Sequence, residues 1–232
     1  MGISERRQRE FLRREREILD AALALFTADD WQAVTVEQIA ERAEIGKGTV
    51  YKHFAGKDEI YARLAAEFQE RALAQLEAID PGLPVLQRLR MIIAVFWTQH
   101  RSGAEHQNLV RYCEREDFRN NLSPEARAEL VQLDARLEAA IGAVLRDGIE
   151  QGILPRKTPQ QLVFGPMAAL TGATRMMWGG CAGDTGADQY LVEITNFILA
   201  GMLYQEWLAE EGLGEDEATR RALAELAAAQ AD

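Results

Sequence analysis

The chain of 232 residues is long enough to bury a substantial core, and its 47% hydrophobic and 27% charged residues are typical of an ordinary soluble globular protein. With 37 acidic against 26 basic side chains, its formal net charge of −11 argues against nucleic-acid binding by the whole surface, but not by one local basic patch. The longest uninterrupted apolar run, Met91 to Trp97, is too short for a membrane span, and the N-terminal arginines are not followed by the apolar run of a secretory signal, so we expect a cytoplasmic protein.

The first predicted element is a helix that ends at the turn-like sequence TADDW. Its apolar residues recur at helical spacing, namely Phe11, Ile18, Ala22, Leu25 and Phe26. The next segment, VTVEQIAERA, predicts a short helix, because Thr35 is a good N-cap and Gln38 stands at the capping-box position. Val34 and Ile39 occupy the positions of a hydrophobic staple across the same helix start.

After these residues, EIGKGTVYKHF has room only for a turn and another brief helix, and Lys57 to Ile79 predicts a longer helix. Two short helices joined by a tight turn, behind a third helix, describe a helix-turn-helix. The two short helices would be held against the first by apolar contacts of Ile39, Ala40, Val50 and Phe54 with Ile18, Ala22 and Phe26.

The segment IGKGTVYKHFAGK, Ile45 to Lys57, has three lysines and a histidine but no acid. A helix that reads DNA offers donors and small side chains to base edges and cations and hydroxyls to phosphates, whereas carboxylates are repelled. Gly48 would let this helix sit deep in the groove, and Lys47 and Thr49 are the predicted base readers. The predicted phosphate contacts are Thr35, Tyr51, Lys52, His53 and Lys57. A solvated basic helix face is the alternative interpretation.

The sequences REREILDAALALF and TVEQIAERAEIGKGTVYKHFAGKDEIYARL resemble the DNA-binding domain of TetR-family transcriptional regulators, over about Arg13 to Leu64 and most sharply over Thr49 to Lys57. The resemblance implies a homodimer with a ligand pocket in its C-terminal body and with operator binding lost when the ligand enters. Asp30 and Glu44 stand where the family often has turn glycines; a left-handed backbone suits Asp better than Glu. Gly46 replaces a frequent serine cap.

An arginine-rich segment overlaps the start of this region. Its basic residues are Arg6, Arg7, Arg9, Arg13, Arg14 and Arg16; with Glu10 and Glu15 among them, residues 6–16 carry a charge of +4 (six minus two). One interpretation is an arm that reaches along the DNA backbone or into the minor groove. The other is a frayed, solvated tail.

The sequence DPGLP, Asp80 to Pro84, is the clearest boundary, and the segments beyond it are again helical in pattern. Helices are predicted over Val85–His100, around His106–Phe118, from Ser123-Pro124, from Thr158-Pro159 with Gln161 as a capping partner, and over Tyr190–Leu208. The sequence thus predicts an all-α protein with a helix-turn-helix domain over 1–60 (the motif at about 35–54), a helical ligand-binding and dimerisation body over 61–210, and a C-terminal tail or short helix over 211–232.

Candidate catalytic and metal-binding patterns are weak. His100, His106 and Cys113 lack a tight ligand spacing, and Cys113 and Cys181 are too far apart in sequence to be called a disulfide. No Gly-x-Ser-x-Gly, phosphate loop or His-Glu-x-x-His is present. We therefore expect no metal, no cofactor and no enzyme activity.

Soft and aromatic side chains in the body could form plain core or line an adaptable cavity for an apolar or amphipathic small molecule. The predicted pocket comprises Phe96, Trp97, Tyr112, Met167, Thr171, Arg175, Met176 and Trp178. Arg175 is the only charge between Lys157 and Asp184; it could anchor an acidic ligand group, pair across a dimer or extend to solvent.

Small residues in the helix Gln160–Trp178, which Pro166 should kink, and an apolar stripe in the last predicted helix suggest a four-helix dimer interface. Its predicted residues are Gly165, Ala169, Gly172, Tyr190, Ile194 and Ile198. The predicted function is a homodimeric repressor released from a palindromic operator by a small molecule. The alternative is a helical protein-interaction module that binds DNA only incidentally.

Overall fold

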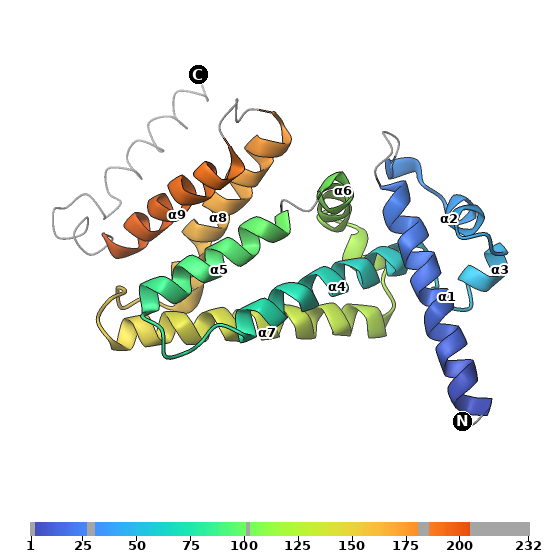
Figure 1. Cartoon of the computed structure of the whole chain (residues 1–232), viewed down its shortest axis with the longest axis horizontal. Coiled ribbons are helices and arrows are strands. Elements are labelled where there is room, and N and C mark those ends of the chain that lie inside the picture. The colour runs from blue at the N-terminus through green and yellow to red at the C-terminus, as the bar shows by residue number, and fades with distance from the viewer. Residues whose placement is uncertain (1–2, 27–30, 101–102, 181–185, 205–232) are drawn as a thin grey trace, which may run out of the picture. The chain divides into compact units, whose positions relative to one another are not determined.

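In a computed structural model, residues 3–26, 31–100, 103–180 and 186–204 are described, and within these ranges the regular structure is entirely helical (Figure 1). The all-α prediction is confirmed. The helices are α1 (Ile3–Leu25), α2 (Val36–Arg42), α3 (Lys47–Val50), α4 (Lys57–Glu77), α5 (Val85–His100), α6 (Gly103–Cys113), α7 (Pro124–Glu150), α8 (Pro159–Trp178) and α9 (Ala187–Leu203), with 3₁₀ turns at Trp31–Ala33 and Phe118–Asn121.

The chain forms two compact units, one of Met1–Asp80 with Met91–Ile141 and the other of Pro81–Arg90 with Gly142–Asp232. The long helices α5 and α7 each contribute residues to both units. The functional division predicted at residue 60 stays a prediction, and the predicted tail 211–232 lies outside the described residues. No helix in the described ranges combines the length and apolar character needed to cross a membrane.

The helix starts follow the capping signals of the sequence. At both Thr35 and Thr158 the side chain accepts a hydrogen bond from the main chain three residues later, and the glutamine there accepts one from the cap main chain. Both capping boxes are therefore confirmed, the second with Pro159 in the first turn. The predicted helix His106–Phe118 instead begins at Gly103 and ends at Cys113, and Phe118 lies in a separate 3₁₀ turn.

The first unit is built around the apolar face of α1. Its core contains Ile18 and Ala22 of α1 and Phe26 just after it. Ile39, Ala40, Val50 and Phe54 belong to the same core, which confirms the predicted packing. Ile18, Ala22, Phe26 and Ile39 are completely buried. Each large apolar side chain removed from water contributes about 1.5–3 kcal/mol, so this core fixes how the short helices lie on α1.

Helix α6 is attached to α1 and α4 by aromatic and polar contacts. The ring of Tyr112 lies edge-on to Tyr61 at 4.5 Å, and its hydroxyl donates a 2.7 Å hydrogen bond to Asp58 at the start of α4. Burial and the nearby Asp58 raise the pKa of Tyr112. Asn108 donates a 2.6 Å hydrogen bond to the carbonyl of Phe26, just beyond the end of α1. Helix α6 thus contacts both helices that support the helix-turn-helix.

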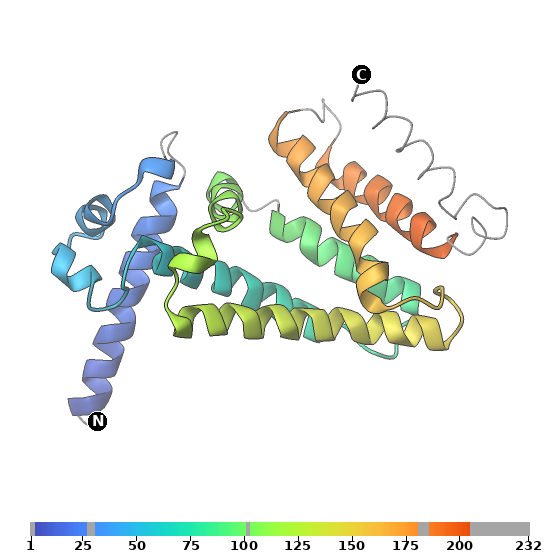
Figure 2. The same cartoon turned by 180° about the vertical axis from the view of Figure 1, so that it is seen from behind.

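In the second unit α8 packs against α9, as seen from behind in Figure 2. The buried Arg88 forms a 2.7 Å ion pair with Asp147, and a Cβ atom at Gly148 would lie only 2.7 Å from the buried Leu154. A larger residue at Gly148 would therefore displace Leu154, which explains glycine at this point of α7. Helix α8 continues through Pro166.

Candidate nucleic-acid interface

The turn of the helix-turn-helix depends on Glu44. Helix α2 ends at Arg42, and Glu44 has φ of 54°, the only positive φ of a non-glycine residue in the described ranges. The chain then returns through a 3.0 Å hydrogen bond from Ile45 N to Ala40 O. The left-handed backbone expected where Glu44 replaces a glycine is confirmed, at a cost of about 1 kcal/mol.

The predicted recognition helix is short. Only Lys47–Val50 is α-helical, with Gly46 as an N-cap that has no side chain to satisfy the first amides. A further turn follows, in which His53 N donates to Val50 O at 2.9 Å. Val50 points inward, with 1% of its surface exposed, whereas Lys47, Gly48, Tyr51 and Lys52 are exposed. The outward face of this segment is therefore built from residues predicted to contact DNA.

Gly48 has no packing role among the described residues. A Cβ atom placed on it would meet nothing within 4 Å, and the same holds for Gly46 and Gly56. Since glycine in a helix is less favourable than alanine by about 1 kcal/mol, the fold alone gives no reason for Gly48. The absence of a side chain instead leaves the outward face of α3 open to close approach by another molecule.

The side chain of Lys47, a predicted base reader, contacts two other residues of the chain. Its ammonium forms an ion pair with Glu37 of α2 and lies 5.7 Å from the centre of the Tyr51 ring. The hydrogen bond that Lys47 donates to Glu37 lowers the pKa of Glu37 and raises the pKa of Lys47. Sequence reasoning missed Glu37, although its position two residues after the Thr35 cap, in the first turn of a short helix, is a signal that could have drawn attention to it.

Lys57 has a partner that the sequence did not predict. Its Nζ donates hydrogen bonds to Val34 O at 2.8 Å and Gln32 O at 3.3 Å and lies 5.4 Å from the centre of the Tyr112 ring. Burial lowers the pKa of Lys57. These contacts tie the start of α4 to the segment before α2, so the ammonium is directed inward rather than toward the face of α3.

His53 joins the recognition segment to α1. Its ring lies 4.1 Å from that of Phe11, and its Nδ1 atom is buried without a hydrogen-bond partner in the described part of the chain. Burial is the largest influence on its pKa, which is lowered. Thr35 and Thr49, the remaining predicted DNA contacts, lie at the N-cap of α2 and within α3.

The arginine-rich segment is helical, since α1 is continuous from Ile3, and this contradicts the frayed-tail interpretation for the described residues. Arg13 and Arg14 form ion pairs of 2.9 and 2.8 Å with Glu17, and Arg16 pairs with Glu67 at 2.9 Å. These three arginines are therefore compensated within the unit.

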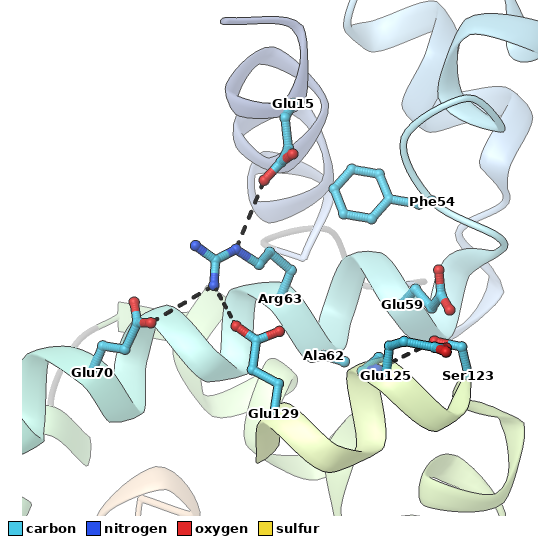
Figure 3. A pocket seen from close by; sticks show the side chains of 10 residues that line it. Glu15, Phe54, Glu59, Ala62, Arg63, Glu70, Ser123, Glu125 and Glu129 are labelled. Carbon is cyan, nitrogen blue, oxygen red and sulfur yellow. Dashed lines mark hydrogen bonds and ion pairs between the residues drawn. The ribbon is translucent and has the colours of Figure 1, made fainter. Parts of the chain in front are cut away.

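An acidic groove of about 530 Å³ lies in the first unit beside α1, α4 and α7 (Figure 3). Arg63 lies within it, with Nη1 2.9 Å from Glu129 and 3.8 Å from Glu70, and Nε 3.8 Å from Glu15. The lining residues are Glu15, Phe54, Glu59, Ala62, Arg63, Glu70, Ser123, Glu125, Ala126 and Glu129. None of the predicted pocket residues lines this groove, and its carboxylates make it unsuited to an apolar ligand.

The predicted pocket residues are divided between the units. Trp97 and Tyr112 are buried in the first unit together with the half-buried Phe96, whereas five lie on α8 in the second: Met167, Thr171, Arg175, Met176 and Trp178. Arg175 and Met176 are exposed. A common cavity for the eight residues stays a prediction.

The predicted dimer residues also differ in exposure. Gly165 and Gly172 of α8 are exposed, and a Cβ atom placed on either would meet nothing within 4 Å, whereas Ala169 is half-buried. On α9, Tyr190 and Ile194 are half-buried, but Ile198 is 4% exposed and belongs to the interior. Phe197, which belongs to the apolar stripe predicted for α9, is 70% exposed, whereas sequence reasoning missed the exposed Phe164 and Val192.

Among the described residues, no group of three His, Cys, Asp or Glu side chains is placed to hold a metal ion. His106 is buried with its ring 4.2 Å from Phe68, and burial raises the pKa of Cys113 to about 12. Cys181 lies outside the described residues, and the side chain of His100 is not described.

Two family models match the chain. Residues 18–64 match the bacterial regulatory proteins of the tetR family, and residues 82–202 match the tetracyclin repressor-like C-terminal domain. The HTH-type transcriptional regulator TcmR of Streptomyces glaucescens is 29% identical over 153 residues, which cover 62% of this chain and 65% of TcmR. The HTH-type transcriptional repressor KstR2 of Mycobacterium tuberculosis is 26% identical over 193 residues, covering 82% of this chain and 92% of KstR2.

Solved structures agree in fold. The fatty acid degradation regulator FadR from Bacillus halodurans superposes with a TM-score of 0.64 at 17% identity, over 81% of this chain and 95% of that one. At this identity the likeness concerns the arrangement of helices.

Proposed function

The chain belongs to the TetR family of DNA-binding transcriptional regulators, and from this premise we propose that it is a cytoplasmic homodimeric repressor that a small apolar or amphipathic molecule releases from a palindromic operator. The observation that carries DNA binding is the outward face of α3, where Lys47, Tyr51 and Lys52 are exposed around an unobstructed Gly48. In this proposal the face enters the major groove, where ammonium and hydroxyl donors meet base edges and phosphates.

The exposed apolar residues of α8 and α9 support dimerisation. Phe164 is 79% exposed and Phe197 is 70% exposed, and glycines on α8 leave room for a neighbouring helix. Exposed apolar surface of this kind is favourable only when something covers it. A second copy, related by a two-fold axis, would cover these helices and align two α3 helices with two half-sites.

The attachment of α6 supports a ligand-controlled switch. A ligand that favours a different position of α6 would act on both the hydrogen bond from Asn108 to Phe26 O and that from Tyr112 to Asp58. Because these contacts lie at the end of α1 and the start of α4, the change would reach the helices that carry α2 and α3. Linkage requires that operator DNA weaken ligand binding by the same factor as the ligand weakens operator binding.

The first test is a gel shift of the purified protein on the DNA upstream of its own gene, together with selection from a pool of random duplexes. The proposal expects binding and a two-fold symmetric selected sequence. Mass spectrometry of molecules that copurify with the protein then identifies the candidate ligand, and calorimetry compares its affinity with and without saturating operator. Absence of binding to any duplex would reject the repressor, and equal ligand affinity in the two measurements would reject the switch.

A further inference from the structure

A carboxylate of α2 lies beside the exposed face of α3. The segment from Ile45 to Lys57 contains none, but folding brings Glu37 of α2 into an ion pair with Lys47 of α3. Both side chains are exposed, at 58% for Glu37 and 48% for Lys47. Phosphates repel a carboxylate, so its position beside the exposed face of α3 needs an explanation.

A contribution to folding stability explains the position of Glu37 only weakly. The pair is open to solvent, and such pairs contribute little because water and salt screen them. An acid in the first turn of α2 also interacts favourably with the helix dipole, but this effect does not require that it face Lys47. The hydrogen bond between the two side chains is therefore a feature of the surface rather than of the core.

The chemistry of the pair matches a base pair better than a phosphate. An ammonium has three donors and Glu37 takes one, which leaves two for acceptors on DNA. Guanine presents the acceptors O6 and N7 in the major groove, and its partner cytosine presents the N4 amino donor, which a glutamate can accept. A phosphate offers acceptors to the ammonium but no donor to the carboxylate.

We propose that Glu37 is a specificity-determining residue, which holds the ammonium of Lys47 so that the two side chains together read one G·C pair in each half-site. The carboxylate withholds Lys47 from phosphates on non-specific DNA, where the neutralised lysine releases no counterion. On the matching base pair, the lysine donates to guanine and the carboxylate accepts from cytosine. This inference rests on the proposed binding of DNA through α3.

The closing experiment compares wild type with Glu37→Gln, Lys47→Ala and the double variant on short duplexes of random sequence over a range of salt concentrations. Glu37→Gln should bind random DNA more tightly, by on the order of tenfold at 0.1 M salt, and its salt dependence should steepen by about 0.9, the value for one added phosphate contact. The double variant should show neither the tighter binding nor the steeper salt dependence, because it has no Lys47 ammonium that could contact a phosphate. Glu41→Gln is the matched control, since it removes an exposed carboxylate one turn further along α2.

A selection from random duplexes gives the second measurement. Wild type should select a G·C pair at one position of each half-site, and Glu37→Gln should lose about tenfold of that preference while other positions keep theirs. The inference is overturned if Glu37→Gln behaves as Glu41→Gln on random DNA, if the gain survives in the double variant, or if the selected sequence does not change. A wild-type protein that binds no duplex would instead reject the DNA-binding proposal itself.

Discussion

The side-chain amide of Asn108 donates a 2.6 Å hydrogen bond to the carbonyl of Phe26, and so joins α6 to the end of α1 across 82 residues of sequence. Carbonyls at the end of a helix lack partners within it, and a side chain that supplies one stabilises that end. In this molecule the donor comes from α6, so the end of α1 is stabilised only while α6 holds its position.

Replacing Asn108 tests this attachment. Asn108→Ala should lower the free energy of unfolding by about 1–2 kcal/mol, because a partly buried carbonyl loses its donor. Urea unfolding followed by circular dichroism measures the loss. Asn120→Ala, on the exposed 3₁₀ turn, is the control and should change stability by less than about 0.5 kcal/mol. Equal effects of the two changes would contradict the attachment.

The two lysines Lys52 and Lys57 should separate DNA affinity from stability. Lys57→Ala should cost about 1–2 kcal/mol of unfolding free energy, because its ammonium donates to Val34 O and Gln32 O. Lys52→Ala should leave stability unchanged but weaken binding to all duplexes and reduce the salt dependence by about 0.9. Urea unfolding and binding titrations on random duplexes measure both. A Lys57→Ala protein of normal stability would return Lys57 to the phosphate role predicted from the sequence.

Glu44 offers a stabilising substitution. Glu44→Gly should raise the free energy of unfolding by about 1 kcal/mol, because glycine adopts the positive φ of 54° without steric cost. Glu41→Gly, in the neighbouring helix, should instead lower it by about 1 kcal/mol, since glycine is unfavourable within a helix. Thermal unfolding of the two variants and wild type measures the changes in melting temperature, which should have opposite signs. Changes of the same sign would mean that the turn is not strained.

A charged substitution tests whether the exposed apolar residues of α8 and α9 form the proposed dimer interface. Phe197→Glu should dissociate the proposed dimer, because an unpaired carboxylate would be buried in its interface, and Gly172→Leu should block close approach of the helices. Sedimentation velocity measures the oligomeric state. Val131→Glu is the matched control, since Val131 is 52% exposed on α7 and its replacement should leave the dimer intact. Intact dimers of Phe197→Glu would place the interface elsewhere.

His53 gives stability a dependence on pH. Burial against Phe11 lowers its pKa below 6.5, with Arg14 and Lys52 acting in the same direction and Glu15 opposing them. The unfolded chain therefore takes up this proton first, and the contribution of His53 should be fully present above about pH 6.5 and be lost as the pH falls toward the lower folded pKa. Urea midpoints at several pH values should fall less in His53→Phe than in wild type. Parallel curves would show that His53 does not contribute.

Local signals in the sequence predicted most of the fold. The cap at Thr35, its partner Gln38 and the spacing of Ile18, Ala22 and Phe26 are properties of single helices, and the structure confirms them. Positions in space between helices were harder to predict. The segment Ile45 to Lys57 contains no acid, and the turn at Glu44 brings Glu37 beside Lys47.

The acidic groove shows the same limit. Glu15, Glu70 and Glu129 read as ordinary solvated charges in three separate helices, and no spacing rule connects them. Their proximity depends on how α1, α4 and α7 pack, which the helical pattern alone does not determine. The charge of Lys57 likewise predicts a phosphate contact, because the sequence does not indicate the carbonyls that bind its ammonium in the fold.

If α3 reads DNA as proposed, the carboxylates beside Arg63 would also influence how the protein searches along DNA. Because acids exceed bases in the chain, orientations that present these carboxylates to the duplex would be repelled, whereas those that present the exposed lysines of α3 would be attracted. Encounters in other orientations end quickly, so the protein spends little time on unrelated sequence. Its search should therefore proceed by repeated short hops through solution rather than by long sliding along the double helix.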